Sequence, residues 1–253
     1  ADSMKFSDSV DLDVMGLIVL VGLNPSQWSR VIPALDASIR KRLARGAKLV
    51  VINSDETRIA SVATINISGD EASALAQISK ALIAKGAKAS KEFESAVSDI
   101  IAAEDASKAA DLLAEIKDAV IFTAPSLFKA SKNLSLLTGI KVVAVPYEAN
   151  ARGVVAMGLT TEGKTYNEMR KSGVDVLYAI GEVPVVKKPD VNFLIVQTAY
   201  MTELAKQADI VLPSAAYLES KGTIINYLGK IKELVKVIEP AGDAKQHKDI
   251  FIE

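Results

Sequence analysis

Cysteine is absent from this chain of 253 residues, and histidine occurs once, at His247. Zinc sites and iron–sulfur clusters draw mainly on these two residue types, so the chain cannot by itself ligate an iron–sulfur cluster. Disulfides and a thiolate nucleophile are excluded for the same reason. The charged segment 243–249 around His247 predicts an exposed helix start, where a histidine lacks the orienting partner that catalysis needs.

Long apolar runs and an excess of basic charge are also lacking. No run reaches the roughly 18–20 residues of a membrane span, and no signal peptide is visible. We therefore expect no direct membrane insertion, and the lack of disulfides is compatible with a cytoplasmic location. The formal net charge of −1 leaves no basic excess to neutralise phosphates, so we expect no nucleic-acid partner.

The hydrophobic residues, 49% of the chain, gather in short, β-branched runs. Because these runs are apolar throughout, they predict strands that are buried on both faces, as in a parallel sheet. Amphipathic stretches at 32–45, 72–84 and 93–117 predict helices, and Asp70 is a predicted N-cap. The alternation of strands and helices indicates a doubly wound α/β fold. The predicted strands are 17–21, 49–52, 119–122, 142–145, 176–180, 193–196 and 210–212.

An internal repeat indicates two lobes. Residues 17–21 lead into Gly22 as residues 176–180 lead into Gly181, and segment 57–65 matches segment 202–210. We expect two consecutive pseudo-repeated lobes, 1–146 and 147–253, which meet over a cleft where a ligand binds. Alternatively, strand–glycine turns recur by chance in α/β proteins.

Candidate ligand contacts follow the predicted strands. Glycine after a parallel strand lets backbone amides approach a phosphate, but neither Gly22 nor Gly181 belongs to a G-x-G-x-x-G motif. A tight turn with positive φ is an equally good interpretation. After the second strand, Asp55 or Glu56 could bind a ribose hydroxyl, or Ser54 or Asp55 could cap a following helix. The polar segments 150–153 and 219–226 line a cleft or are ordinary loops.

Several of these segments resemble the nucleotide-type domains of molybdopterin oxidoreductases. Residues 19–25 (VLVGLNP) and 45–52 (RGAKLVVI) resemble the first of these domains. The most specific match is to the second, at 208–213 (ADIVLP) followed by E-x-x-G-T at 219–223. Further matches lie at 177–184, 193–197 and 237–244, so the resemblance spans nearly the whole chain. Residues 146–153 (PYEANARG) are most similar to the large iron–sulfur (G) subunit of NADH:quinone oxidoreductase, respiratory complex I, followed by formate dehydrogenase alpha subunits.

The resemblance implies lobes like those of formate dehydrogenase and dimethyl sulfoxide reductase, in a fragment of an electron-transfer oxidoreductase subunit. The second lobe is expected to be incomplete without upstream chain, where a cysteine-rich region would hold the iron–sulfur clusters. Expected partners are other subunits of a respiratory or formate-oxidising complex. The expected location is cytoplasmic, peripheral to the inner membrane through those subunits. We expect the isolated chain to be inactive, with no catalytic residue and no metal site.

The resemblance also implies a pterin-nucleotide cleft, although this chain departs from the family pattern there. Relatives that bind molybdopterin guanine dinucleotide typically show Asp-Pro-Arg after the strand that ends here at Ile52, where this chain has Asn53, Ser54 and Asp55. An acid facing a pyrophosphate costs ~1 kcal/mol or more at partial burial. The implied cleft, vestigial or weak, consists of Gly22, Asn24, Asn53, Asp55, Gly181, Glu182, Gly222, Thr223 and Asn226.

A scaffold domain without its own cofactor is therefore the favoured function. A true molybdopterin guanine dinucleotide-binding domain of a formate-dehydrogenase-like enzyme is the first alternative. An unrelated nucleotide-binding domain of a thiamine-diphosphate-type enzyme is the second.

Overall fold

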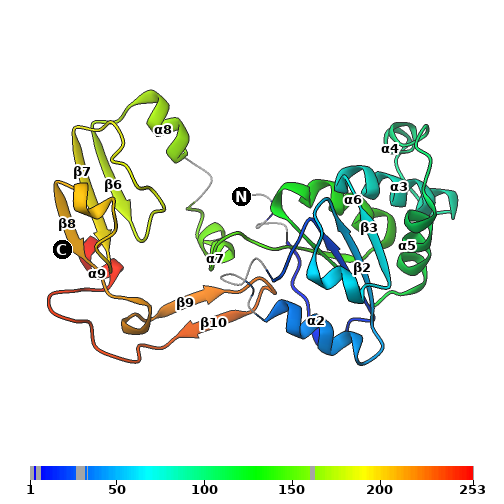
Figure 1. The fold of residues 1–253 in the computed structure, drawn as a ribbon, viewed down its shortest axis with the longest axis horizontal. Coiled ribbons are helices and arrows are strands. Elements are labelled where there is room, and N and C mark those ends of the chain that lie inside the picture. Colours follow the sequence, from blue (N-terminus) through cyan, green and yellow to red (C-terminus); the bar gives the residue numbers. More distant parts are fainter. Residues whose placement is uncertain (1–2, 4–6, 27–31, 33, 160–162, 253) are drawn as a thin grey trace. The chain divides into compact units, whose positions relative to one another are not determined.

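A computed structural model describes residue 3 and residues 7–26, 32, 34–159 and 163–252 of the chain. The chain forms two compact units, which are coloured along the sequence in Figure 1. The first unit comprises residues 1–159 and 225–231, and the second comprises residues 160–224 and 232–253. The units divide after residue 159, whereas the sequence predicts a lobe boundary after residue 146.

A five-stranded parallel sheet forms the centre of the first unit, in the order β3-β2-β1-β4-β5. All its neighbouring strands run parallel. β1, β2, β4 and β5 correspond to predicted strands, and their apolar runs are almost wholly buried. The predicted α/β class with buried parallel strands is confirmed. The strands are β1 (Leu17–Val21), β2 (Lys48–Asn53), β3 (Ile65–Ser68), β4 (Ala119–Thr123) and β5 (Lys141–Ala144).

Helices cover both faces of this sheet (Figure 1). On one face lie α3 (Glu71–Ala84), α5 (Glu104–Glu115) and α6 (Phe128–Thr138). On the other lie η1 (Leu12–Val14), α2 (Leu35–Leu43), η2 (Arg58–Val62) and residues 227–228. The predicted helix at 32–45 is found as α2, and residue 33 falls outside the described residues. Asp70 caps α3 as predicted, since its carboxylate accepts a hydrogen bond from the Ser73 amide at 2.7 Å.

The single helix predicted at 93–117 is wrong. Two helices occur instead, α4 (Lys91–Ala96) and α5, separated by residues 97–103. This separating segment contains Val97, Ser98, Asp99, Ile100 and Ile101, which are all weaker helix formers than alanine or leucine. The Gln77 side chain of α3 then accepts a hydrogen bond from the Ala103 amide at 3.0 Å, at the residue that caps α5.

The second unit contains a smaller parallel sheet, in the order β6-β7-β8, whose strands were all predicted. The two-stranded sheet β9–β10 follows along the chain, and its tip, residues 225–231, belongs to the first unit. The strands are β6 (Val176–Ile180), β7 (Phe193–Thr198), β8 (Ile210–Pro213), β9 (Gly222–Ile225) and β10 (Ile231–Leu234). The remaining helices are η3 (Pro125–Leu127), α7 (Ala151–Ala156), α8 (Tyr166–Ser172), η4 (Ala205–Gln207), η5 (Tyr217–Glu219) and α9 (His247–Ile252).

The internal repeat predicted from the sequence extends to individual hydrogen bonds. Strands β1-β2-β3 and β6-β7-β8 share one register, in which residues 17–21 correspond to 176–180 and residues 48–68 to 193–213. In each copy the glycine after the first strand donates to the last buried residue of the second. The matched pairs of bonds are Gly22 N to Ile52 O (2.9 Å) with Gly181 N to Gln197 O (2.8 Å), and Thr64 N to Leu49 O (2.7 Å) with Asp209 N to Leu194 O (2.9 Å).

Candidate functional site

The carboxyl ends of β1 and β2 form the candidate site of the first unit. The chain order reverses between β1 and β4, and open α/β sheets bind ligands at the carboxyl ends of their strands beside such a reversal. Four of the predicted site residues follow these two strands directly. Gly22 and Asn24 come after β1, whereas Asn53 ends β2 and Asp55 follows it.

Gly22 satisfies needs of the fold at this edge. Its φ is +62°, and a Cβ atom there would lie 2.6 Å from Leu127 Cδ1. Its amide donates to Ile52 O, so this N–H group is already used. The tight-turn interpretation therefore accounts for the glycine without a ligand.

Asn53 bridges the ends of the two strands. It is 7% exposed, and its Nδ2 donates to Leu23 O at 3.1 Å, while its Oδ1 accepts from the Asp55 amide at 2.9 Å. The next amide, that of Ser54, donates to Glu71 Oε1 at 2.7 Å. Since an ionised aspartate has no donor for Leu23 O, the amide side chain fits this bridge better than the acid typical of pterin-binding relatives.

A pyrophosphate does not fit this edge of the first unit. A phosphate accepts hydrogen bonds, but the Ser54 and Asp55 amides are bonded within the chain, and the Asp55 and Glu56 carboxylates are exposed beside them. Asn24 Oδ1 is buried without a hydrogen-bond partner among the described residues, and an acceptor of this kind needs a donor. The Thr57 hydroxyl, in a side chain that is 4% exposed, likewise has no partner there.

The matching edge of the second unit is more open. Gly181 has a φ of +82°, and no atom lies within 4 Å of the place where its Cβ would be. Glu182 follows it and is exposed. Gly181 could therefore let a ligand approach the backbone closely, although the neighbouring carboxylate would repel a phosphate.

Behind Gly181, three side chains form a hydrogen-bonded chain that the sequence reasoning missed. The Tyr178 hydroxyl donates to Gln197 Oε1, and Gln197 Nε2 lies 2.7 Å from His247 Nδ1. Gln197 is fully buried, and a polar residue inside the apolar run FLIVQT is a signal that could have pointed to it. The predicted exposed His247 is wrong, because the ring is half-buried against this glutamine.

Acid is expected to loosen α9 because His247 must stay neutral. The Gln197 amide nitrogen can only donate, so His247 Nδ1 accepts, and burial lowers the pKa of His247 below its ordinary 6.5. The unfolded chain therefore binds the proton more readily, and docking of α9 weakens as the pH falls below about 6.5.

Hydrogen exchange of residues 247–252 at about pH 7.5 and about pH 5.5 measures this loosening. The control variant His247→Asn keeps an acceptor but does not titrate, so its exchange protection should not depend on this ionisation. Equal protection of the native α9 at both pH values, after correction for intrinsic exchange, would contradict the prediction.

The remaining predicted residues lie on the hairpin. Gly222 and Thr223 are exposed in β9, in the second unit. Asn226 lies in the tip, in the first unit, and its Oδ1 accepts from the Lys230 amide at 2.9 Å. The predicted site residues therefore form three groups, and their assembly into one pterin cleft stays a prediction.

The polar segment 150–153 anchors the hairpin tip within the first unit. Asn150 Oδ1 accepts from the Ile225 amide at 2.9 Å. Arg152 donates from Nη1 to Tyr227 O at 3.0 Å and to Asp8 O at 3.0 Å, and from Nη2 to Ser7 O at 2.8 Å. Burial lowers the pKa of Arg152, and the nearby Asp8 opposes that shift. This segment therefore joins three parts of the first unit.

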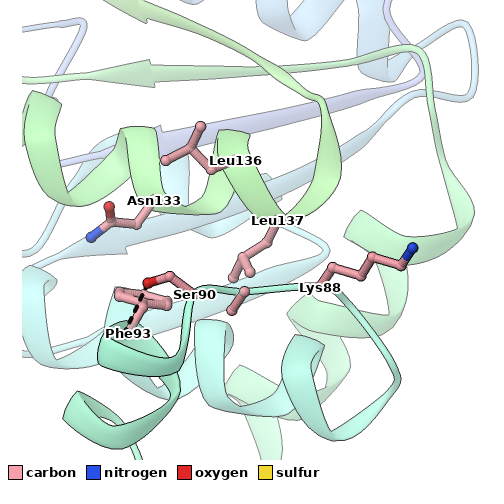
Figure 2. Close-up of a pocket in the computed structure, with 7 residues that line it drawn as sticks. Lys88, Ser90, Phe93, Asn133, Leu136 and Leu137 are labelled. Atoms are coloured by element: carbon pink, nitrogen blue, oxygen red, sulfur yellow. Dashed lines mark hydrogen bonds between the residues drawn. The ribbon is translucent and has the colours of Figure 1, made fainter.

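A surface cavity of about 450 Å³ lies away from all the predicted site residues. Figure 2 shows Lys88, Ser90 and Phe93 on one side and Asn133, Leu136 and Leu137 of α6 on the other. Ser90 uses its hydroxyl to cap α4, accepting from the Phe93 amide at 3.2 Å. Its lining is mainly apolar, with Lys88 exposed at the rim, and it carries no functional assignment.

Metal and membrane sites were also sought. Among the described residues, no three His, Asp or Glu side chains are grouped so that they could hold a metal ion. Within the same ranges, no helix is both long and apolar enough to cross a membrane.

Comparison with known proteins supplies the family context. The family model "Molybdopterin oxidoreductase" matches residues 3–253. A G-type chain of NADH-quinone oxidoreductase from Rhizobium meliloti is 42% identical over 91 residues, which cover 32% of this chain and 11% of that protein. The F420-dependent formate dehydrogenase subunit alpha of Methanocaldococcus jannaschii is 39% identical over 95 residues, covering 32% of this chain and 14% of that protein.

Two longer matches cover nearly the whole chain. The NADPH-Fe(3+) oxidoreductase subunit alpha of Geobacter sulfurreducens is 26% identical across 97% of this chain and 38% of its own length. Acetylene hydratase from Pelobacter acetylenicus matches in structure with a TM-score of 0.73 at 16% identity, over 98% of this chain and 48% of that chain. The latter shows a shared fold. The chain thus spans less than half the length of these relatives.

Proposed function

This chain belongs to the molybdopterin oxidoreductase family, and we propose that it is a scaffold domain of an electron-transfer oxidoreductase subunit. The parent enzyme would be of the NADH dehydrogenase or formate dehydrogenase type, and this domain would carry no redox centre of its own. The matches to subunits of such enzymes support the parent type. The family match decides against a thiamine-diphosphate-type domain.

The observation that carries the scaffold proposal is the closed end of β2. The Ser54 and Asp55 amides, which a nucleotide phosphate would use, are bonded to Glu71 and Asn53. Displacing Glu71 would free one amide, but the ligand would then meet three carboxylates from residues 55, 56 and 71. The absence of cysteine adds that no thiolate of this chain can ligate a cluster.

The proposal extends to partners and location. A scaffold domain contributes surfaces, so its partners would be the cluster-bearing part of the enzyme and other subunits. The names of the first two relatives describe them as subunits, which supports such an assembly. We place the parent enzyme in the cytoplasm, attached to the inner membrane through those partners.

Calorimetric titration with GDP, the part of the pterin cofactor that a nucleotide-type lobe would hold, tests the scaffold proposal. We expect no binding heat up to about 1 mM, because the closed amides and the carboxylates oppose a diphosphate. Micromolar binding would overturn the proposal in favour of a pterin-nucleotide domain. In that case Gly181→Ala, which adds a Cβ in open space, would show whether the second unit holds the nucleotide.

Metal analysis of the whole enzyme provides the second test. Stoichiometric molybdenum or tungsten would contradict a purely structural role for the nucleotide-type lobes. Iron without either metal is the expected result, since the proposal places clusters outside this chain.

A further inference from the structure

One face of the sheet β6-β7-β8 exposes a contiguous set of apolar side chains. Because alternate residues of a strand point to the same side, the set combines every second residue of the three strands. Val176 is 58% exposed, Ile180 45% and Ile210 43%, which is unusual for a parallel sheet. We call this the open face, and its residues are Val176, Tyr178, Ile180, Phe193, Ile195, Ile210 and Leu212.

The matching face of the first unit is covered. By the register of the repeat, Leu17, Val19 and Val21 of β1 correspond to Val176, Tyr178 and Ile180 of β6, and all three are fully buried. The side chains that bury this face belong to α3, α5 and α6. The two copies therefore carry the same apolar pattern on their strands, but only one of them has its cover among the described residues.

Helix α9 occupies the start of the path that α3 takes. In the first unit, α3 begins shortly after β3 ends. In the second unit, the hairpin intervenes, and the chain then returns to the end of β8, where Ala215 N donates to Lys245 O at 2.8 Å and Ser214 is bridged to Lys245. Helix α9 begins two residues later, at His247.

The contacts of α9 place it on the open face. The rings of Phe251 and Tyr178 lie 5.9 Å apart between centroids, and His247 meets Gln197 of the same face. Phe251 is the fifth residue of α9, as the buried Leu75 is the fifth of α3. However, α9 has 6 residues and α3 has 14, and the later residues Ile78, Ala81 and Leu82 of α3 are also buried.

We propose that the open face is the docking surface of an amphipathic helix that prolongs α9. That helix would place small and branched apolar residues where α3 places Ile78, Ala81 and Leu82. Continuity with α9 favours this occupant over a second copy of the sheet, because His247 and Phe251 already stand on the face and would obstruct flat sheet-to-sheet packing.

The proposal also predicts which part of the face is covered. In the first unit α3 contacts β2, whereas α5 contacts β3. A prolonged α9 should therefore protect β7 and the adjoining β6, and should leave Ile210 of β8 more accessible.

Thiol labelling tests this docking directly, because the chain has no cysteine of its own. Single variants Val176→Cys, Ile195→Cys and Ile210→Cys probe the face, and Val186→Cys, at a side chain that is 73% exposed away from the face, is the control. Each variant is prepared in the chain as it stands and in a chain prolonged after Glu253 by a copy of residues 78–86, the second half of α3. A matched control extension carries serine in place of the residues copied from Ile78 and Leu82.

We expect the prolonged chain to label about tenfold or more slowly at positions 176 and 195, with a smaller change at 210 and none at 186. The serine extension should give no slowing. Far-ultraviolet circular dichroism and an unchanged labelling rate at 186 show that each variant is folded, and a variant that fails either check is replaced by Tyr178→Cys.

Three outcomes would overturn the proposal. Unchanged labelling in the prolonged chain would mean that the face does not accept a helix. Equal slowing with both extensions would mean that cover does not depend on apolar contacts. Protection of the unprolonged chain that grows with protein concentration would assign the face to a second copy.

Discussion

Replacing Gly229 by alanine is expected to destabilise the first unit by about 2–5 kcal/mol and to release the hairpin tip. Gly229 has a φ of +81°, and an added Cβ would lie 1.9 Å from Ser9 Oγ and 2.8 Å from Ser9 Cβ. A left-handed backbone costs a non-glycine residue about 1–2 kcal/mol, and the overlap with Ser9 adds to that cost. Ser9 cannot move freely, because the Val10 amide beside it donates to Leu228 O at 3.3 Å.

The measurement combines urea unfolding with hydrogen exchange of residues 7–12 and 225–231. The control Gly242→Ala carries the same kind of backbone cost, with a φ of +58°, but has no atom within 4 Å of the added Cβ. The double variant Gly229→Ala, Ser9→Gly removes the overlapping atoms and should recover the part of the loss that is due to contact. If Gly229→Ala cost no more than Gly242→Ala, the close packing of the tip against Ser9 would be wrong.

Replacing Arg152 by methionine is expected to cost about 3 kcal/mol or more. Methionine keeps the apolar stem but removes the donors to Ser7 O, Asp8 O and Tyr227 O. Hydrogen bonds to a charged group each contribute about 1.5–3 kcal/mol, and the carbonyl groups left behind lose a partner in a partly buried place. The Tyr227 ring should then become more exposed, so its pKa, which burial raises, should fall toward 10.0.

Arg40→Met is the matched control for Arg152→Met. Arg40 is an exposed arginine that pairs with Asp36 on the same helix, and its loss should cost about 0.5 kcal/mol or less. Arg152→Lys should restore part of the stability, because one ammonium group cannot reproduce the planar fork. The losses from Arg152→Met and Gly229→Ala should add to less than their sum, since both release the same tip. Full additivity would indicate that Arg152 and Gly229 act independently.

The strands of the fold could be predicted because their signal is local. Continuous runs such as 17–21 and 119–122 are apolar on both faces, and burial on both faces requires that pattern. Strand β3 was missed because it lies at the sheet edge, where Asn66 and Ser68 alternate with half-buried isoleucines. The break between α4 and α5 was missed because several weak helix formers in succession end a helix without a proline or glycine to mark the place.

The candidate site was placed more successfully than it was interpreted. The sequence located Gly22, Asn24, Asn53 and Asp55 at the ends of two strands, where the structure has them. It did not indicate that Asn53 and Glu71 bond the amides there, because Glu71 lies 17 residues from Ser54 and on a helix. Arg152 appeared as part of an ordinary polar loop, because its partner Tyr227 lies 75 residues away.

The sequence by itself determined the α/β class, the parallel strands, the internal repeat and the inability to ligate a metal through cysteine. These properties follow from composition and from the spacing of apolar residues, which act over a few residues. Only the tertiary structure decided that the Ser54 and Asp55 amides are closed, that Arg152 anchors the hairpin tip, and that the open face of β6-β7-β8 extends beyond α9. Each of these depends on which distant segments meet, and the topology of the folded chain sets those meetings.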